Sequence, residues 1–366
     1  MKFTCQKDAL QNAINIVSKA VSSKTSMPIL ECILVKAEDG GVKLTANDME
    51  MAIETAKIEA EVKEEGTIAL EARMFSEIIR RVNGEKVSVS TGENNSAVIN
   101  CGFSEYKIMG QPGDDFPEIP SITKQEPYKI KQKDLKNLII STIFSVASDE
   151  SKPTLTGELI EISEEYVNIV AVDGYRISYK KAAAVSSPEP AKVIVPAKTL
   201  KEISRILLDG EEDVEIYITE NHILFDMEGN ILVSRVINGE FIKYDQAFTN
   251  EYKTRAVINR SELISALERA SLVSRDARKV PVKLDIHPDN IIITSQTEMG
   301  SAYEELNTQT EGDELKIAFN PRYLIDALRA IEDEKVAVQF NSPLSPCIIK
   351  QEEGEEYKYL VLPLRM

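Results

Sequence analysis

The chain has 366 residues, of which 43% are hydrophobic and 28% charged, an ordinary balance for a globular protein of two or three domains. Its net charge of −17 argues against a surface that is basic throughout and against binding to an anionic membrane. No apolar run reaches the roughly 18 residues of a membrane span, and the first residues lack the apolar region of an export signal, so a cytoplasmic protein is expected.

The same succession of elements recurs along the chain. A short strand is followed by an amphipathic helix and then by strands with alternating polarity, and this unit is predicted six times, twice in each of three segments. The alternation at 214–218, for example, is typical of a strand with one buried face. The predicted helices span 7–21, 73–83, 133–148, 198–208, 260–275 and 321–332.

Local chemistry supports individual helices. In the first, Leu10, Ile14 and Val17 form one apolar stripe at helical spacing. Asn259 is predicted to cap the fifth helix, and Asn320, which precedes a proline, is predicted to cap the sixth. The sequence therefore predicts an α+β protein of helices and antiparallel strands.

Positive charge is concentrated on the predicted helices. Together they carry a formal charge of +7, so the rest of the chain carries −24. A basic face that recurs in this way favours a polyanion, bound through phosphate contacts that do not read sequence. Aromatic interleaving for single strands and a glycine-rich phosphate loop are both missing from the sequence, so duplex contact is preferred. The basic residues opposite the apolar stripes of the second and fourth helices are Arg73, Arg80, Lys198, Lys201 and Arg205.

Six short motifs are spread along the chain. They are Pro-Ile-Leu at 28–30, Phe-Pro at 116–117, Leu-Thr-Gly at 155–157, Val-Asp-Gly-Tyr-Arg-Ile at 172–177, Asn-Pro-Arg-Tyr at 320–323 and Tyr-Leu-Val-Leu-Pro-Leu-Arg-Met at 359–366. An Asp-Gly pair alone is chiefly a hairpin-turn signal, but the turn and the tail are specific in combination. With these motifs the chain resembles the bacterial DNA polymerase III beta subunit family, the sliding clamps, over essentially its full length.

The resemblance implies the DNA clamp fold, with three similar domains of two helix-plus-antiparallel-sheet repeats each. The expected domains are 1–124, 125–250 and 251–366. Two subunits would close head to tail into a ring-shaped homodimer, with helices lining the interior and sheets outside. Such a clamp would encircle double-stranded DNA at the nucleoid and tether the replicative polymerase. It would act as a processivity factor with no catalytic centre and no cofactor of its own.

The resemblance also implies a pocket for short linear peptides between the second and third domains. The expected partners are the DNA polymerase III alpha subunit, the clamp loader, other polymerases and repair proteins. Segment 241–246 lacks the proline and arginine that the family often has at the pocket's edge, which bears on partner preference. By position, the pocket residues are Leu155, Val172, Gly174, Tyr175, Arg176, Ile177, Asn320, Tyr323, Leu344, Pro346, Val361, Leu362, Pro363, Leu364, Arg365 and Met366.

Two further surfaces follow from the same resemblance. Lys24 stands where the family often has arginine, so the charge is kept but the bidentate geometry is lost. The ring-closing interface is expected to place Tyr106 and Ile108 of one copy against Leu272 and Val273 of the other. The residues expected to face DNA are Lys24, Arg73, Arg80, Lys152, Lys198, Lys201 and Arg205.

Two other classes of function compete with a clamp. An enzyme is disfavoured because the chain has only two histidines, in a strand pattern and before a proline turn, and no nucleophile in an elbow motif. A zinc site is disfavoured because the four cysteines are far apart and form no CxxC pair, so buried free thiols are expected. The remaining alternative is a repeat-built scaffold that binds proteins but not DNA.

Overall fold

The computed structural model describes residues 1–22, 24–122, 126–249, 251–273 and 280–365. Residues 124, 125 and 250 at the expected domain boundaries, the expected end of the fifth helix at 275, and Met366 lie outside the described residues. By its internal contacts the chain divides into two compact units, 1–132 with 205–236 and 133–204 with 237–366. The boundaries of three domains therefore stay a prediction.

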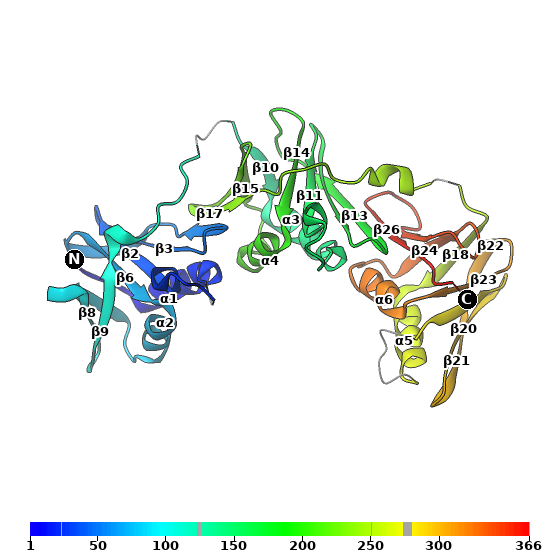
Figure 1. Cartoon of the computed structure of the whole chain (residues 1–366), viewed down its shortest axis with the longest axis horizontal. Coiled ribbons are helices and arrows are strands. Elements are labelled where there is room, and N and C mark those ends of the chain that lie inside the picture. The colour runs from blue at the N-terminus through cyan, green and yellow to red at the C-terminus, as the bar shows by residue number, and fades with distance from the viewer. Residues whose placement is uncertain (23, 123–125, 250, 274–279, 366) are drawn as a thin grey trace. The chain divides into compact units, whose positions relative to one another are not determined.

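The predicted strand-and-helix repeat is confirmed in the described residues, where five of the six α-helices begin directly after a strand and the last begins after a single capping residue, Asn320 (Figure 1). Asn259 accepts hydrogen bonds from the amides of Ser261 and Glu262, and Asn320 accepts one from Arg322, so both predicted caps are present. Glu71 caps the second helix in the same way, which was not predicted. The helices are α1 (Lys7–Val17), α2 (Ala72–Arg81), α3 (Gln132–Ile140), α4 (Ala197–Ile206), α5 (Arg260–Ser271) and α6 (Pro321–Arg329).

The third helix is shorter than predicted, because it ends at Ile140 rather than at 148. The hydroxyl of Thr142 donates to the carbonyl oxygen of Leu138 at 2.8 Å, and a 3-10 turn, Ile143–Ser145, follows. A helix is weakened by side chains that hydrogen-bond to backbone carbonyls, and also by β-branched residues. The prediction was too long because it followed the apolar spacing, which continues past the residue where the helix ends.

The first unit contains a mixed-length sheet in the order β10-β15-β16-β17-β4-β3-β2-β6-β9-β8-β7-β1-β5, in which β5 also pairs with β3. Helices α1 and α2 contact each other (Figure 1). The strands are β1 (Lys2–Gln6), β2 (Cys32–Glu38), β3 (Gly41–Asn47), β4 (Met51–Glu54), β5 (Ile58–Glu64), β6 (Gly66–Glu71), β7 (Lys86–Thr91), β8 (Ser96–Cys101), β9 (Ser104–Pro112), β10 (Tyr128–Lys131), β15 (Asp213–Ile218), β16 (His222–Met227) and β17 (Asn230–Arg235).

The second unit contains two sheets, in the orders β14-β11-β12-β13-β26-β25-β24-β18-β22 and β21-β20-β19-β23. Helices α5 and α6 contact each other and share one apolar core with strands of both sheets. The strands are β11 (Gly157–Ile162), β12 (Tyr166–Val172), β13 (Arg176–Ala183), β14 (Ala191–Pro196), β18 (Thr254–Asn259), β19 (Val282–Ile286), β20 (Asn290–Thr297), β21 (Gly300–Asn307), β22 (Gln309–Gly312), β23 (Leu315–Phe319), β24 (Lys335–Phe340), β25 (Cys347–Lys350) and β26 (Tyr357–Val361).

Glu158 on β11 is an unusual core residue. Its side chain is fully buried, and neither carboxylate oxygen has a hydrogen-bond partner. Burial raises the pKa of Glu158 to about 8, and the nearby Thr142 hydroxyl and Lys201 charge oppose this only in part. Burial without a hydrogen-bond partner therefore favours the neutral, protonated form of Glu158.

We expect Glu158→Met to change how stability depends on pH. Between the ordinary pKa of 4.5 and about 8 the unfolded chain has released this proton while the folded chain keeps it, so the free energy of unfolding falls as pH rises. The variant should gain a few kcal/mol over the wild type from pH 5 to pH 8, at about 1.4 kcal/mol per pKa unit. Urea unfolding at equal protein concentration measures this. The exposed control Glu164→Met should follow the wild type. Parallel pH curves for Glu158→Met and wild type would refute the assignment.

Candidate functional site

The last strand, β26, lies beside the hairpin formed by β12 and β13. β26 pairs antiparallel with β13, with Arg176 opposite Val361 and Ile177 opposite Leu360. Beyond the strand, the amide of Leu362 donates to the carbonyl oxygen of Tyr175 at 2.9 Å. This pairing brings together the two sequence motifs that are specific in combination, the turn at 172–177 and the tail.

The turn between β12 and β13 is built by Asp173 and Gly174. One carboxylate oxygen of Asp173 accepts from the amides of Tyr175 at 2.9 Å and Arg176 at 3.1 Å. Gly174 has a φ of +90°, a backbone conformation that side chains with a Cβ rarely adopt. The turn thereby holds the Tyr175 side chain exposed at the end of the hairpin.

Arg176 is buried and satisfied within the protein. Its guanidinium donates to Asp173 at 2.9 Å, to Asp326 of α6 at 2.7 Å and to the carbonyl oxygen of Phe144. Its Cζ also lies 4.6 Å from the centroid of the Tyr323 ring, which stacks on Tyr175. Arg176 therefore positions α6 and Tyr323 against the hairpin and does not present a free charge to a ligand.

Three of the predicted pocket residues share one apolar cluster. Leu155, Val172 and Ile177 are buried together with Leu360 and Tyr244. Sequence reasoning missed Tyr244, which lies in a 3-10 turn, Tyr244–Ala247, of the segment that departs from the family pattern. Its aromatic character in a connecting segment was the only available signal.

Several large apolar side chains of the hairpin turn, of the loop before β25 and of the tail are exposed. β26 ends at Val361, and the tail then crosses to β23, where the amide of Leu364 donates to Ala318 at 2.8 Å. The strand thus stops before Pro363, as predicted for a residue that cannot donate to a ladder. We define the partner surface as the cluster residues Leu155, Val172, Ile177 and Leu360 with the exposed residues Tyr175 (59%), Leu344 (75%), Leu362 (40%) and Leu364 (39%).

Two of the residues predicted for the pocket have structural roles elsewhere. Val361 is buried in the core shared by α5 and α6, because successive side chains of a strand point to opposite faces, so its place in the pocket stays a prediction that its burial does not support. Asn320 caps α6. Pro346 and Pro363 are half-buried, Arg365 is exposed, and Met366 lies outside the described residues.

The seven predicted DNA-facing residues are all exposed. Arg73 and Arg80 lie on α2, where Arg80 and the unpredicted Arg81 both pair with Glu77. The other five are two loop lysines, Lys24 and Lys152, and the α4 residues Lys198, Lys201 and Arg205.

Only some of the residues predicted to close the ring are exposed to solvent. Tyr106 and Leu272 are exposed and Val273 is half-buried, whereas Ile108 is 8% exposed and belongs to the core of its unit. The ring-closing interface stays a prediction. The sequence reasoning missed three exposed apolar residues on the strands that carry or follow the predicted interface residues, or at the turn before β9. They are Phe103 and Met109, at the β8–β9 turn and on β9, and Tyr303 on β21.

Metal and redox chemistry find no support in the described part of the chain. No group of three or more His, Cys, Asp or Glu side chains is placed there to hold a metal ion. All four cysteines are buried free thiols, as predicted. Among the described residues, no helix is long and apolar enough to cross a membrane.

Comparison with known proteins agrees with this architecture. Models of the N-terminal, central and C-terminal domains of the DNA polymerase III beta subunit match residues 1–120, 129–243 and 245–365. The beta sliding clamp of Bacillus subtilis (strain 168) is 34% identical, with 100% of both chains covered.

Solved structures give the same result. The crystal structure of a putative DNA polymerase III beta subunit from Eubacterium rectale is 42% identical, with a TM-score of 0.96 and 100% of both chains covered. The structure of the Bacillus subtilis sliding clamp is 34% identical, with a TM-score of 0.96, and covers 100% of this chain and 99% of that one. The chain belongs to the DNA polymerase III beta subunit family, the non-catalytic sliding clamps, and has their fold of three domains built from helices and antiparallel sheets.

Proposed function

We propose that the chain forms a ring-shaped homodimer that encircles double-stranded DNA and tethers a replicative DNA polymerase. The observation that carries this proposal is that the basic residues at equivalent places of α2 and α4 are all exposed, in a chain whose net charge is −17. Contact through such residues is electrostatic and blind to sequence, as a clamp that slides requires.

Two strand edges support the closing of a ring. β21 lies at the edge of its sheet, and residues 104–109 of β9 pair with β8, while β9 meets β6 only at Gly110–Pro112 in the described residues. Exposed edges invite pairing with another chain, and here Tyr106 and Leu272 add apolar surface. A head-to-tail contact of one edge with the other closes at two copies.

The partner surface is proposed to bind short linear peptides of other proteins. Apolar side chains at a chain terminus are otherwise costly to leave in water, and Leu362 and Leu364 flank a buried cluster that can extend their contact. The expected partners are the DNA polymerase III alpha subunit, a clamp loader, other polymerases and repair proteins, in the cytoplasm. A scaffold that binds proteins without DNA shares this surface but does not explain the basic helix faces.

Charge reversal tests the DNA contact. Arg80→Glu with Lys198→Glu should reduce loading onto primed DNA by a clamp loader with ATP, and should lower the salt slope of DNA binding by about one unit per lost phosphate contact. The control is Lys63→Glu with Lys283→Glu, which makes the same change of net charge at exposed strand positions. Equal loading of the two double variants at moderate salt would show that α2 and α4 do not face DNA.

Truncation tests the partner surface. Deleting residues 362–366 removes Leu362 and Leu364 but leaves β26 intact, so the chain should stay folded and dimeric. Its affinity for a polymerase-derived peptide should fall at least about tenfold, or 1.4 kcal/mol, in a fluorescence anisotropy titration. Glu353→Ala, an exposed polar position in the loop before β26, is the control and should keep full affinity. Full affinity after truncation, or global unfolding, would contradict this role.

A further inference from the structure

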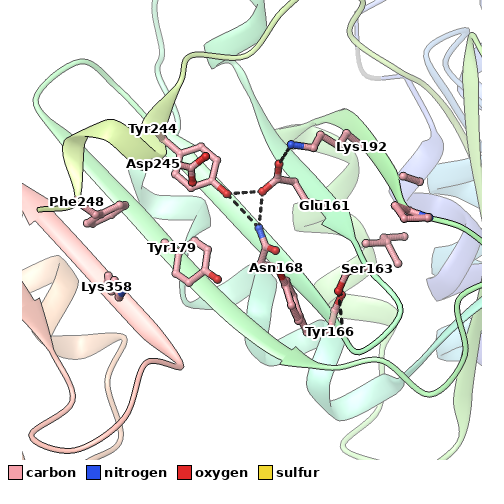
Figure 2. Close-up of a pocket in the computed structure, with 13 residues that line it drawn as sticks. Glu161, Ser163, Tyr166, Asn168, Tyr179, Lys192, Tyr244, Asp245, Phe248 and Lys358 are labelled. Carbon is pink, nitrogen blue, oxygen red and sulfur yellow. Dashed lines mark hydrogen bonds and ion pairs between the residues drawn. The ribbon is translucent and has the colours of Figure 1, made fainter. Parts of the chain in front are cut away.

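A second concave site lies on the nine-stranded sheet, and Tyr244 joins it to the apolar cluster of the partner surface. It is a cavity of about 570 Å³ between strands β11 to β14 and the 3-10 turn at Tyr244–Ala247 (Figure 2). None of its lining residues is among those assigned to the partner surface, DNA or ring closure. A cavity of this size falls in the range of small-ligand sites, roughly 300–1,000 Å³.

The base of the cavity is a carboxylate, Glu161. Asn168 donates to it at 2.8 Å, the Tyr244 hydroxyl donates to the same oxygen, and the Lys192 ammonium pairs with the other oxygen (Figure 2). Burial alone would raise the pKa of Glu161, but these three hydrogen bonds outweigh it and lower the pKa. The site therefore offers a fixed negative charge at neutral pH.

Lys192 is a replaceable partner of that carboxylate. The Glu161 side chain is only 13% exposed, whereas that of Lys192 is 72% exposed. Because the Lys192 end of this ion pair lies largely in solvent, the pair is weak, and another cation can take the place of the Lys192 ammonium at little cost. Asn168 and Tyr244 would still hold the carboxylate in position.

Aromatic rings form the walls of the cavity. Tyr179 lies 6.2 Å from Tyr244 and 6.3 Å from Phe248 between ring centroids, and Tyr166 stands at the opposite side (Figure 2). The Tyr166 ring already has the Lys181 ammonium 5.9 Å from its centroid. A carboxylate among aromatic faces is the chemistry that binds ammonium and guanidinium groups.

An anionic ligand is the competing possibility, because two lysines line the cavity. Lys192 pairs with Glu161, however, and Lys358 lies 3.4 Å from Glu355. The carboxylates of Glu161 and Asp245 also line the cavity and would repel an anion. The balance of charges favours a cation.

We propose that this cavity binds an organic cation, an ammonium or guanidinium group on an aliphatic chain, whose charged end replaces Lys192 at Glu161 and whose chain lies against the tyrosine rings. The cation is either a free amine or a lysine or arginine side chain of a bound polypeptide. The cavity, at about 570 Å³, is larger than a single ammonium ion. The proposed ligand therefore carries a chain of several carbons that fills the remaining space.

Calorimetric titration of the full-length chain with 1,5-diaminopentane tests the proposal. The wild type should bind it, and Lys192→Ala, which removes the competing ammonium, should bind severalfold more tightly. Glu161→Gln in the Lys192→Ala background should lose this gain, and 1,5-pentanediol, which has no charge, should not bind. No saturable binding to the wild type, or equal binding of the diol, would overturn the proposal.

Glu161→Gln could disturb the fold, because Glu161 also accepts hydrogen bonds from Tyr244 and Asn168. A second variant therefore tests the cavity at a residue that lies outside this hydrogen-bond network. Tyr166→Leu changes an exposed wall residue and should weaken diamine binding severalfold, and unchanged affinity would count against the aromatic wall. Blocked lysine, acetylated at its α-amine and amidated, separates the two sources. Tighter binding of blocked lysine than of diamine identifies a polypeptide side chain, and the reverse order identifies a free amine.

Discussion

The pairing of β26 with β13 is the constraint on which the partner surface depends. Its register sets Ile177 beside Leu360 on the face that carries the apolar cluster, and sends Val361 to the opposite face and the core of α5 and α6. A slip of one residue would exchange these faces. The same register ends the strand where Leu362 reaches Tyr175, so the tail leaves the sheet at the hairpin and nowhere else.

Two ion-pair groups on this sheet differ widely in strength. Arg176 is buried between two carboxylates and two rings, and removing one partner of such a network typically costs about 3–5 kcal/mol. The Lys192–Glu161 pair, with one end in solvent, contributes about 0–1 kcal/mol. The first fixes α6 against the hairpin, whereas the second can exchange its cation. Tyr244 links the regions, with its ring in the apolar cluster and its hydroxyl on Glu161.

Local patterns in the sequence were sufficient for the repeat, the helix caps and the end of the last strand, because each depends on neighbouring residues. They could not place Val361 or Ile108, since which face of a strand is buried depends on its long-range partners. The buried Glu158 and the Tyr244–Glu161 contact, across 83 residues, were missed for the same reason. The family resemblance named most of the partner surface but gave no reason to expect that Arg176 is occupied within the protein.

The claim that connects the basic helix faces, the strand edges and the partner surface is that the protein holds DNA by encircling it. Retention on DNA of different topology tests this most directly. Protein loaded onto nicked circular DNA by a clamp loader with ATP should remain bound through gel filtration, and should be released when a restriction enzyme linearises the circle. Equal retention on circular and linear DNA would contradict a ring and would indicate an ordinary binding protein.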